Sequence, residues 1–595
     1  MWTFCLITAI LFLILSVVFA FVRMKKYKTG ALFDPLRILF AGVIVSSVIL
    51  FLPIYISTRD EGGYGVWESV LLSLHNVIRL FVVDADFESI TTVLENVSVR
   101  GGYTAIFSIL FLAAPFLTFG FVLTFFKNVS AYRRYFEHFY SDVFVFSELN
   151  EKSLALAKSL HDNSGKRRFF VFTDVFERDE ESSFELLEKA MEIGAVCFKK
   201  DVVTVHFSWH SKKKQLNFFA IGDDQTENVN QALSLIKKYK NRENTQLFVF
   251  SSQLEAEMLL SGAFQDAGGE IKMKVRRINE VQSLIFRNLY ENGFNSIFQN
   301  ACDHPDGIKR INAVVVGMGG YGTEMTKALT WFCQMDGYLA EIHSFDADEL
   351  AEQRFRAECP ELMEFSGKLD IEGESRYTVC IHSGVHPSAD DFYQTVRRLP
   401  QTTYVFVALD NDEMNIATAV KLRETFERMR IDPVIQAILV NSDKKEALQG
   451  VTNFKGQEYR IDFIGDIHSS YSENVILGSD VEEVAKERHL KWGSETEFWR
   501  YNYNYKSSVA SAIHRKMKTL CGIPGIEKAP KDREENELWN LRILEHRRWN
   551  AYMRSEGYVY GGTVEKCGRN DLAKMHNCLV PFDQLPLKEQ EKDDD

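Results

Sequence analysis

The nine cysteines of this sequence show no spacing typical of a metal site or a redox motif. No C-x-x-C stretch occurs, and no pair of cysteines is spaced like zinc ligands. Structural zinc sites and small disulfide scaffolds both need regularly spaced cysteines. The scatter therefore predicts reduced thiols, a cytosolic location for most of the chain, no disulfide and no bound metal.

Excess positive charge is also missing, because 69 lysines and arginines face 82 aspartates and glutamates. The formal net charge of −13 at pH 7 argues against a protein that binds nucleic acid over a basic surface. No Ser-His-Asp, Cys-His or metal-ligand arrangement is evident, and isolated histidines such as His343, His382 and His386 are typical of packing or polar positions. We expect no nucleic-acid partner and no catalytic residue; a membrane-bound NAD-dependent enzyme stays a third alternative.

Long apolar runs are present at the start of a chain whose 595 residues exceed the roughly 250–300 that one hydrophobic core usually holds. Residues 2–22, 38–57 and 103–126 each reach the ~20 residues that a membrane-crossing helix needs. Positive charges follow the first run, and no small-residue cleavage site is evident, so we interpret it as an anchor and not as a cleaved signal peptide. The runs predict an α-helical membrane domain over residues 1–137.

Charged residues between these runs predict the orientation of the membrane domain. The first loop and the segment after the third run are basic, whereas the segment between the second and third runs is acidic. The basic positions are Arg23, Lys25, Lys26, Lys28, Arg37, Lys127, Arg133 and Arg134. Because lysine and arginine accumulate on the cytoplasmic side, we expect a multi-pass membrane protein with an outside N-terminus and a large cytoplasmic C-terminal region.

A polar stripe marks residues 66–83, which are otherwise apolar. Glu68, His75 and Arg79 are seven and four positions apart and so share one face of a helix. Polar side chains at membrane depth usually face water or protein, which makes the stripe a candidate pore lining. The alternatives are a re-entrant helix and an amphipathic helix on the outer membrane surface; a fourth crossing would place a basic region on the wrong side.

The letters G-G-Y-G at residues 62–65 look like part of a potassium-selectivity filter. A filter needs a pore helix before its glycine loop, whereas here the amphipathic segment comes after the glycines. We therefore interpret this stretch as a surface turn that gives no support to potassium selectivity.

From residue 138 onward, short β-rich runs alternate with helical runs, which predicts parallel sheets flanked by helices. The alternation occurs twice, over residues 138–300 and 301–485, and predicts two Rossmann-like units in tandem. Residues 486–532 form the expected helical connector, and residues 533–595 form a small, mainly helical C-terminal domain.

The second unit carries G-x-G-x-x-G at Gly317, Gly319 and Gly322, between an expected strand and an expected helix. Glycines there let a phosphate approach the amides of a helix N-terminus, and Asp346, after the next strand, is placed to accept hydrogen bonds from ribose hydroxyls. The first unit has F-S-E-L-N-E-K-S at the matching turn, without glycine, so we expect it to be degenerate and mainly structural.

Both units also place an aspartate at a strand end and an asparagine five residues later, Asp223 with Asn228 and Asp410 with Asn415. Two explanations stay open: the side chains cap the following helix, or they contact a ligand at the carboxyl ends of the strands. The two units together resemble the RCK family of Rossmann domains over about residues 141–478. That resemblance implies control of potassium channels or transporters by a nucleotide such as NAD or ATP.

The most specific stretch is the last. It combines E-H-R-R-W at residues 545–549, G-Y-V-Y-G at 557–561 and K-M-H-N-C-L-V-P-F-D-Q-L-P at 574–586. Arginine offers a planar fork to phosphate, and aromatic faces stack on bases, so a nucleotide pocket is predicted. Its candidate residues are His546, Arg547, Arg548, Trp549, Tyr558, Tyr560, Lys574, His576 and Asn577. The alternative is that the aromatic residues form a core and the arginines solvate a helix.

This C-terminal stretch closely resembles the RyR domain, a small repeat first described in ryanodine receptors and also found in prokaryotic proteins. Membrane-anchored members of that kind resemble proposed sensors of nucleotide-derived signals in antiviral conflict systems. The resemblance implies an effector of the bacterial inner membrane that a cyclic nucleotide or similar second messenger activates and that forms a pore or disrupts the bilayer. Because three spans per chain do not readily enclose a channel, we expect a homo-oligomer. The alternative is a potassium channel or transport regulator gated by NAD or ATP through the RCK-like units.

Overall fold

A computed structural model describes the chain from Met1 to Asp593, and some internal segments lie outside the description. These segments are residues 27–32, 59–64, 83, 85–86, 96, 164–167, 175–180, 253–255, 257, 261–262, 264–271, 369–374, 478 and 563–567. Only the backbone is described at residues 21–26, 33–37, 87–89, 120–130, 181–183, 479, 496 and 500. The chain divides into two compact units: Met1–Phe139 with Phe172–Ser183 and Val196–Val205, and the remainder.

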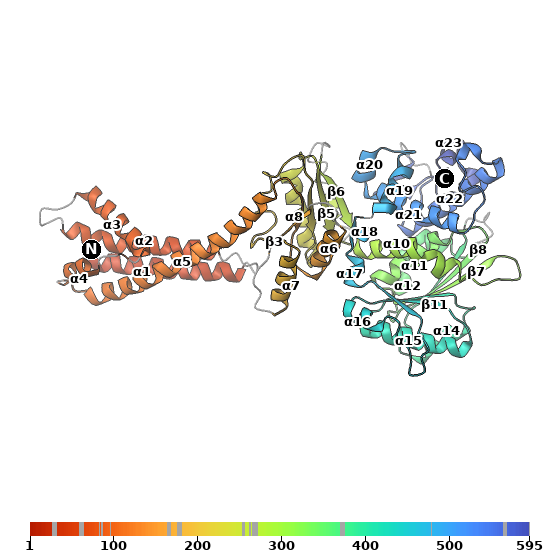
Figure 1. Ribbon diagram of the computed structural model, residues 1–595, viewed down its shortest axis with the longest axis horizontal. Coiled ribbons are helices and arrows are strands. Elements are labelled where there is room, and N and C mark those ends of the chain that lie inside the picture. Colours follow the sequence, from red (N-terminus) through yellow and green to blue (C-terminus); the bar gives the residue numbers. More distant parts are fainter. Residues whose placement is uncertain are drawn as a thin grey trace. The chain divides into compact units, whose positions relative to one another are not determined.

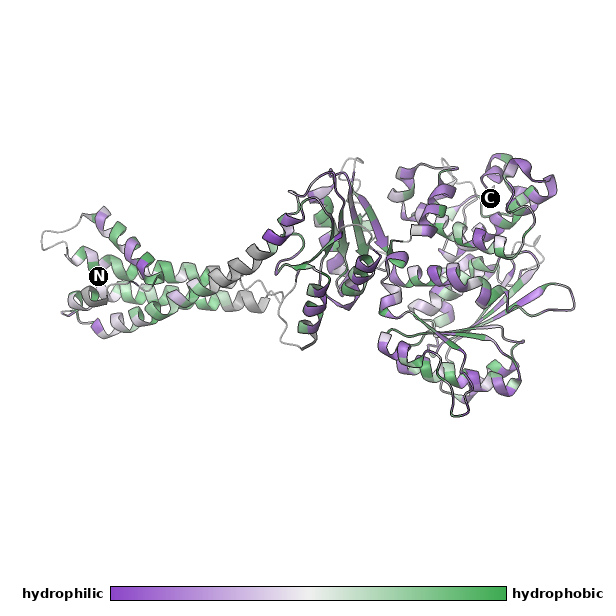
Figure 2. Cartoon of the chain, in the orientation of Figure 1, coloured by the Kyte–Doolittle hydropathy of each residue, from purple (hydrophilic) through white to green (hydrophobic). Residues whose placement is uncertain are grey.

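The first of these two compact units is helical from Met1 to Phe139 (Figure 1). Its helices are α1 (Trp2–Lys26), α2 (Phe33–Ser57), α3 (Val66–Phe81), α4 (Phe87–Val93) and α5 (Arg100–Glu137). Trp2–Ala20, Ile38–Ser57 and Arg100–Phe119 are long and apolar enough to cross a membrane, and hydrophobic residues dominate these helices in Figure 2. The three expected apolar spans are thus confirmed as helices.

Small residues let α1 and α2 pack closely in this unit. A β-carbon on Gly42 would lie 2.2 Å from the hydroxyl oxygen of Ser16, and Ser46 donates a hydrogen bond to the carbonyl of Ala9 at 3.1 Å. Such contacts are typical of helices packed in lipid, where small side chains allow close approach. α3 has 16 residues, fewer than the ~20 of a full crossing, and it packs against α2.

The first sheet has the strand order β3-β2-β1-β4-β5-β6. The strands are β1 (Asp142–Phe146), β2 (Arg168–Phe172), β3 (Val196–Cys197), β4 (Leu216–Ala220), β5 (Thr245–Phe250) and β6 (Lys274–Ile278). The helices between and after them include α6 (Glu151–Asp162), α7 (Glu181–Glu192), α8 (Gln225–Tyr239) and α10 (Glu280–Gly293). The register is parallel where β1 meets β4 and where β5 meets both β4 and β6.

The second sheet repeats this order as β12-β11-β10-β7-β8-β9, with parallel pairs throughout. Its strands are β7 (Lys309–Val316), β8 (Tyr338–Phe345), β9 (Tyr377–His382), β10 (Tyr404–Val407), β11 (Val434–Ile438) and β12 (Ile461–Ile464). Its main helices are α11 (Gly320–Phe332), α12 (Ala351–Glu358), α14 (Asp390–Arg398), α15 (Asp412–Met429) and α16 (Ser442–Leu448). The predicted tandem of parallel, Rossmann-like sheets is confirmed, and the order reverses beside β7, where such sheets bind ligands.

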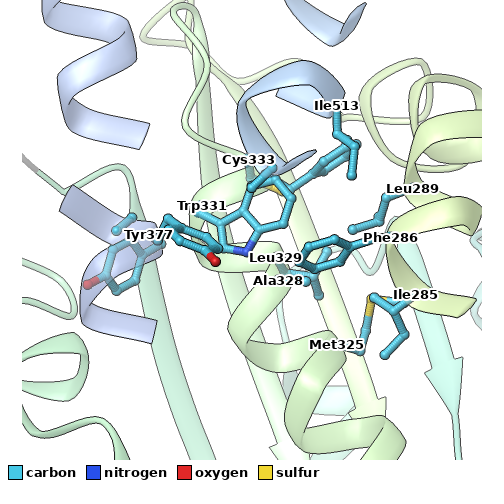
Figure 3. Packing of buried hydrophobic residues seen from close by; sticks show 14 of the residues in the cluster. Ile285, Phe286, Leu289, Met325, Ala328, Leu329, Trp331, Cys333, Tyr377 and Ile513 are labelled. Atoms are coloured by element: carbon cyan, nitrogen blue, oxygen red, sulfur yellow. The ribbon is translucent and has the colours of Figure 1, made fainter. Parts of the chain in front are cut away.

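The C-terminal part packs on the second sheet through a shared core. It contains α19 (Ser479–His489), α20 (Glu495–Arg500), α21 (Asn502–Leu520), α22 (Glu535–Ser555) and a small sheet of β13 (Val559–Tyr560), β14 (Arg569–Asn570) and β15 (Met575–His576). Trp331 of α11 packs edge to face on both Phe286 of α10 and Tyr552 of α22, with ring centroids 5.4 and 6.1 Å away. Figure 3 shows Trp331 with Phe286 and with Ile513 of α21, which belongs to the same cluster. The C-terminal helices therefore complete the core of the second sheet.

Candidate functional site

The glycine loop joins β7 to α11 at the point where the strand order reverses. Gly317 has a φ of 91°, and a β-carbon there would lie 2.3 Å from the carbonyl oxygen of Ala408. A β-carbon on Gly322 would lie 1.7 Å from the carbonyl oxygen of Gly317, whereas one on Gly319, the N-cap of α11, would meet nothing within 4 Å. Two of the glycines are thus required by the fold, and the third leaves space in front of the helix.

Asp346 holds this loop from the end of β8. Its carboxylate accepts hydrogen bonds from the backbone N–H of Met318 at 2.5 Å and of Asp348 at 2.7 Å. A cavity of about 600 Å³ lies beside the loop, and five carboxylates line it with one arginine, Arg354. The carboxylates are those of Glu324, Asp346, Asp348, Glu358 and Asp410. Because this wall is strongly acidic, it is poorly suited to a polyphosphate.

Asn228 and Asn415 make equivalent hydrogen bonds in the two Rossmann-like units. Asn415 accepts a hydrogen bond from the N–H of Leu409 at 2.6 Å and donates one to its carbonyl at 3.3 Å. Asn228 makes the same pair of bonds with Gly222, at 2.6 and 2.9 Å. Each asparagine therefore fixes the turn after its strand.

Helix capping in these units belongs to other residues. The side chain of Asp224 caps α8 and that of Asn411 caps α15, so the idea that Asp223 and Asp410 cap these helices was wrong by one residue. Asp410 instead lines the cavity beside the glycine loop and a second one of about 530 Å³ that extends from Gly319 to Lys444.

A cavity of about 650 Å³ with a mixed cationic and aromatic wall lies within the C-terminal part. Of the residues predicted from the sequence, those that line it are His546, Arg548, Trp549, His576 and Asn577. A volume of this size suits a small organic ligand such as a nucleotide. Residues of α19, α21, α22 and the small sheet line this cavity.

Four predicted residues are not among the lining residues in the described part of the chain. Arg547 donates a hydrogen bond to Asp336, in the turn between α11 and β8, at 2.6 Å, and Tyr558 donates one to Asp571 at 2.8 Å. Lys574 donates a hydrogen bond to the carbonyl of Glu556 at 2.7 Å. The side chain of Tyr560 is exposed. These residues hold the C-terminal part together or face solvent.

The connector supplies wall residues that the motif reasoning missed. They are Arg488, Lys491, Trp492, Tyr503, Ser507, Ser508 and Ser511, and Arg569 joins them from β14. The stretch E-R-H-L-K-W at residues 487–492 mixes basic and aromatic residues as E-H-R-R-W does. That similarity was the available signal, because nothing else in the connector marks a pocket.

A buried charge cluster centred on Glu545 forms one wall of this cavity. The Glu545 carboxylate accepts hydrogen bonds from Arg548 at 2.7 Å, Ser511 at 2.7 Å and Lys518 at 2.8 Å, and Arg488 lies 3.8 Å away. Burial alone would raise the pKa of Glu545, yet the positive charges of Arg548, Lys518 and Arg488 outweigh it and hold this pKa well below its usual range. Glu545 is therefore a buried carboxylate anion surrounded by cations.

Two nitrogens of Arg548, Nε and Nη1, have no hydrogen-bond partner among the residues that the structure describes, and the same holds for the Ser508 hydroxyl. Arg548 is only 2% exposed and Ser508 only 4%. Buried donors without partners are costly, so such groups mark places where another acceptor fits. Both side chains belong to the cavity wall.

Aromatic rings form much of the remaining wall. Trp549 meets His576 edge to face at 4.9 Å, and the Arg569 guanidinium lies 4.2 Å from the ring centroid of Tyr503. Burial, and next the charge of Arg569, lower the pKa of His576 to about 4, so this histidine is neutral at physiological pH. Flat rings beside guanidinium groups can stack on a base and pair with phosphate.

The predicted membrane stripe lies on the outward face of α3. Glu68 and His75 are exposed, and Arg79 pairs with Asp84 at 3.1 Å. The inward face carries Ser69, Ser73, Asn76, Val77 and Leu80. Among the described residues of a single chain, the stripe therefore faces outward and not into a channel. Residues 62–64 of the G-G-Y-G stretch lie outside the described residues, and Gly65 precedes α3.

No protein-family model matches the chain, and a search of curated proteins finds no match either.

Proposed function

We propose that this protein is a ligand-gated membrane effector that a nucleotide-derived signal activates through the C-terminal cavity. The observation that carries the proposal is the wall of that cavity, where the buried Arg548, with two nitrogens that have no partner in the described part of the chain, stands beside tryptophan and tyrosine rings. This combination is the one that recognises a base and a phosphate together. The three apolar helices supply the membrane part.

The effector acts as a homo-oligomer in the inner membrane of a bacterium, with an outside N-terminus and a cytoplasmic sensor. Three spans per chain do not readily enclose a pore, so several copies surround it or disrupt the bilayer together. The outward face of α3, where Glu68 and His75 stand among Trp67, Leu71 and Ile78, is available for contacts between copies. The resemblance of the C-terminal stretch to the RyR domain supports a role for such an effector in antiviral defence.

The end of α5 connects the apolar helices to the cytoplasmic part of the first unit. Tyr132 of α5 packs edge to face on Phe198 with ring centroids 4.9 Å apart, and the Lys200 ammonium lies 5.5 Å from the Tyr132 ring. A shift of the segment that contains β3 would therefore move α5. The signal gates the membrane only if it binds the open state more tightly than the closed one.

The test uses the full chain in liposomes that hold a fluorescent dye and a potassium gradient. We expect one nucleotide from a panel of cyclic mono-, di- and oligonucleotides, their linear forms, NAD, ADP-ribose and ATP to release the dye. Arg548→Gln abolishes this response, and Arg547→Gln, which changes the neighbouring arginine outside the cavity wall, preserves it. A saturating nucleotide that binds without any change in permeability would refute the proposal.

A second candidate is a potassium channel or transport regulator gated by NAD or ATP. It is favoured by the glycine loop, which lies where the strand order reverses and borders two cavities. Potassium-selective flux that NAD or ATP controls, and that Gly319→Asp abolishes while Arg548→Gln leaves it intact, would support this function. Unselective leakage favours the effector.

A further inference from the structure

We propose that the C-terminal cavity binds the terminal phosphate of its ligand, a dianionic phosphomonoester, on Arg488, Arg548 and Ser508, where Glu545 is the resident counter-ion. This inference rests on the proposed function, because it names the class of nucleotide that the same cavity takes. It distinguishes linear nucleotides with a free phosphate from cyclic phosphodiesters.

The charge balance of the buried cluster points to a doubly charged ligand. Arg488, Lys518 and Arg548 carry three positive charges when protonated, and Glu545 carries one negative charge, so two positive charges are left. All four side chains are buried, with exposures of 11% or less. Uncompensated charge is costly in such a place.

The other titratable groups near this cluster include His514, Arg515, His546 and Asp593. His514 of α21 is buried, and burial followed by the charge of Lys518 lowers its pKa far below the usual value, so it is neutral. Asp593 pairs with His546 at 3.2 Å on the C-terminal side. Arg515 interacts with Arg488 and Glu545, and Asp593 interacts with Arg548 and Glu545. This further positive charge and this further negative charge offset each other, so the excess stays with Arg488, Arg548 and Lys518.

Unpartnered donors show where the ligand's oxygens fit. Nε and Nη1 of Arg548 and the Ser508 hydroxyl have no acceptor within the described part of the chain, whereas Nη2 of Arg548 is bound to Glu545. A phosphate has enough oxygens to accept from a guanidinium edge and a hydroxyl at once. Ser507 and Ser508, on one turn of α21, both line the cavity at this end.

A phosphomonoester fits this site better than a phosphodiester. At neutral pH a monoester carries a charge of about −1.5 to −2, which balances the excess, whereas a diester carries a single charge and would leave one buried cation uncompensated. A terminal phosphate also presents three free oxygens to donors, and a bridging one presents two. The base then lies toward Trp549 and Tyr503 on the aromatic wall.

The protonation state of Lys518 can change when the ligand binds. It lies behind Glu545, fully buried, and burial lowers its pKa to about 7, although the adjacent Glu545 carboxylate opposes this shift. A dianion on Arg548 would draw a proton onto Lys518. The cluster can thus hold a second positive charge when the ligand brings its second negative one.

The test titrates the full chain in detergent with matched probes by calorimetry. The first set is inorganic phosphate, adenosine, 5′-AMP and 3′,5′-cyclic AMP, and the second is linear ApA with a 5′-phosphate, ApA without it, and cyclic di-AMP. We expect the phosphomonoester of a set to bind at least about tenfold more tightly than its cyclic or dephosphorylated partner. Arg548→Gln removes this preference, and Arg547→Gln retains it.

Ser508→Ala is a second test that does not depend on the folding of the arginine variants. The Ser508 hydroxyl makes no hydrogen bond within the described protein, so its removal should not disturb the fold. We expect an unchanged melting temperature without ligand and a loss of affinity for the phosphomonoester of roughly threefold to tenfold. Equal or tighter binding of the cyclic probes overturns the inference, and so does the absence of any phosphate binding at millimolar concentration. A cyclic nucleotide that permeabilises liposomes would overturn only this inference, whereas binding without permeation would overturn only the proposed function.

Discussion

Two adjacent arginines on α22, Arg547 and Arg548, have different surroundings. This difference provides a matched control for testing the role of the C-terminal cavity. Arg547 pairs with Asp336 in the turn before β8, and Arg548 pairs with Glu545 in the cavity wall. Successive residues on a helix point about 100° apart, so neighbours of one chemical type face different partners. Both are buried, so exchanging either for glutamine removes a buried charge, but only one exchange touches the cavity.

Binding of a phosphomonoester should be strongest between about pH 6 and pH 7. Lys518 has a pKa lowered to about 7, so above that pH the free protein lacks the proton that a bound dianion recruits, and affinity falls by up to tenfold per pH unit. Below about pH 6 the phosphate takes up its second proton and affinity falls again. Calorimetry across this range measures the profile. Lys518→Met should remove the decline above pH 7; a wild-type affinity that stays constant there would contradict the prediction.

Asn415→Ala should lower stability by roughly 1–3 kcal/mol, because it leaves the N–H and carbonyl of Leu409 without their partner. The same change at Asn228 should have a similar effect through Gly222. Thermal unfolding measures both. Asn411→Ala, which removes only the cap of α15, is the matched control and should cost about 1 kcal/mol. Equal stability of Asn415→Ala and wild type would show that this bridge is dispensable.

At the scale of elements, the loop between β7 and α11 requires glycine at two positions and leaves open space at a third. Gly317→Ala and Gly322→Ala should each destabilise the second sheet by at least about 1–3 kcal/mol, because their β-carbons would collide with backbone oxygens. Gly319→Ala should change stability by less than about 0.5 kcal/mol, since nothing lies within 4 Å. Melting temperatures of the three variants test this order, and a Gly319 variant as unstable as the other two would refute it.

Features that depend only on residues close together in the sequence were predictable. The apolar helices follow from local hydropathy, and the strand, glycine loop and helix at residues 309–332 follow from a local pattern. The role of Asp346 as a clamp on Met318 was not predictable, because β8 brings it to the loop from 28 positions away. The cavity wall from Arg488 and Ser508 was missed for the same reason, since α21 and α22 must pack before it exists.

At the scale of the whole molecule, the C-terminal part of the chain also completes the core of the second sheet. Tyr552, Met553 and Leu544 of α22 are buried in the same cluster as Trp331, and Arg554 lies 3.7 Å from the ring centroid of Phe365. The C-terminal part and the second sheet therefore share one core, and the ligand that we propose for the C-terminal cavity would act directly on the helices of the sheet.

Removal of residues 533–595 should leave the second sheet unstable, because it exposes Trp331 and its apolar neighbours to water. We expect aggregation of the truncated chain, or a much lower melting temperature, in a purification that yields soluble full-length protein in detergent. A truncated chain that melts like the full chain would show that the sheet does not depend on α22.

The most direct test of the account compares two concentration dependences on the same full-length protein in liposomes. One is the binding of the most effective 5′-phosphorylated nucleotide, and the other is the permeability that this nucleotide produces. The account predicts that both curves shift together to higher concentration in Arg548→Gln and Ser508→Ala and stay in place in Arg547→Gln. Permeability that keeps its wild-type dependence after Arg548→Gln would contradict the claim that the C-terminal cavity gates the membrane.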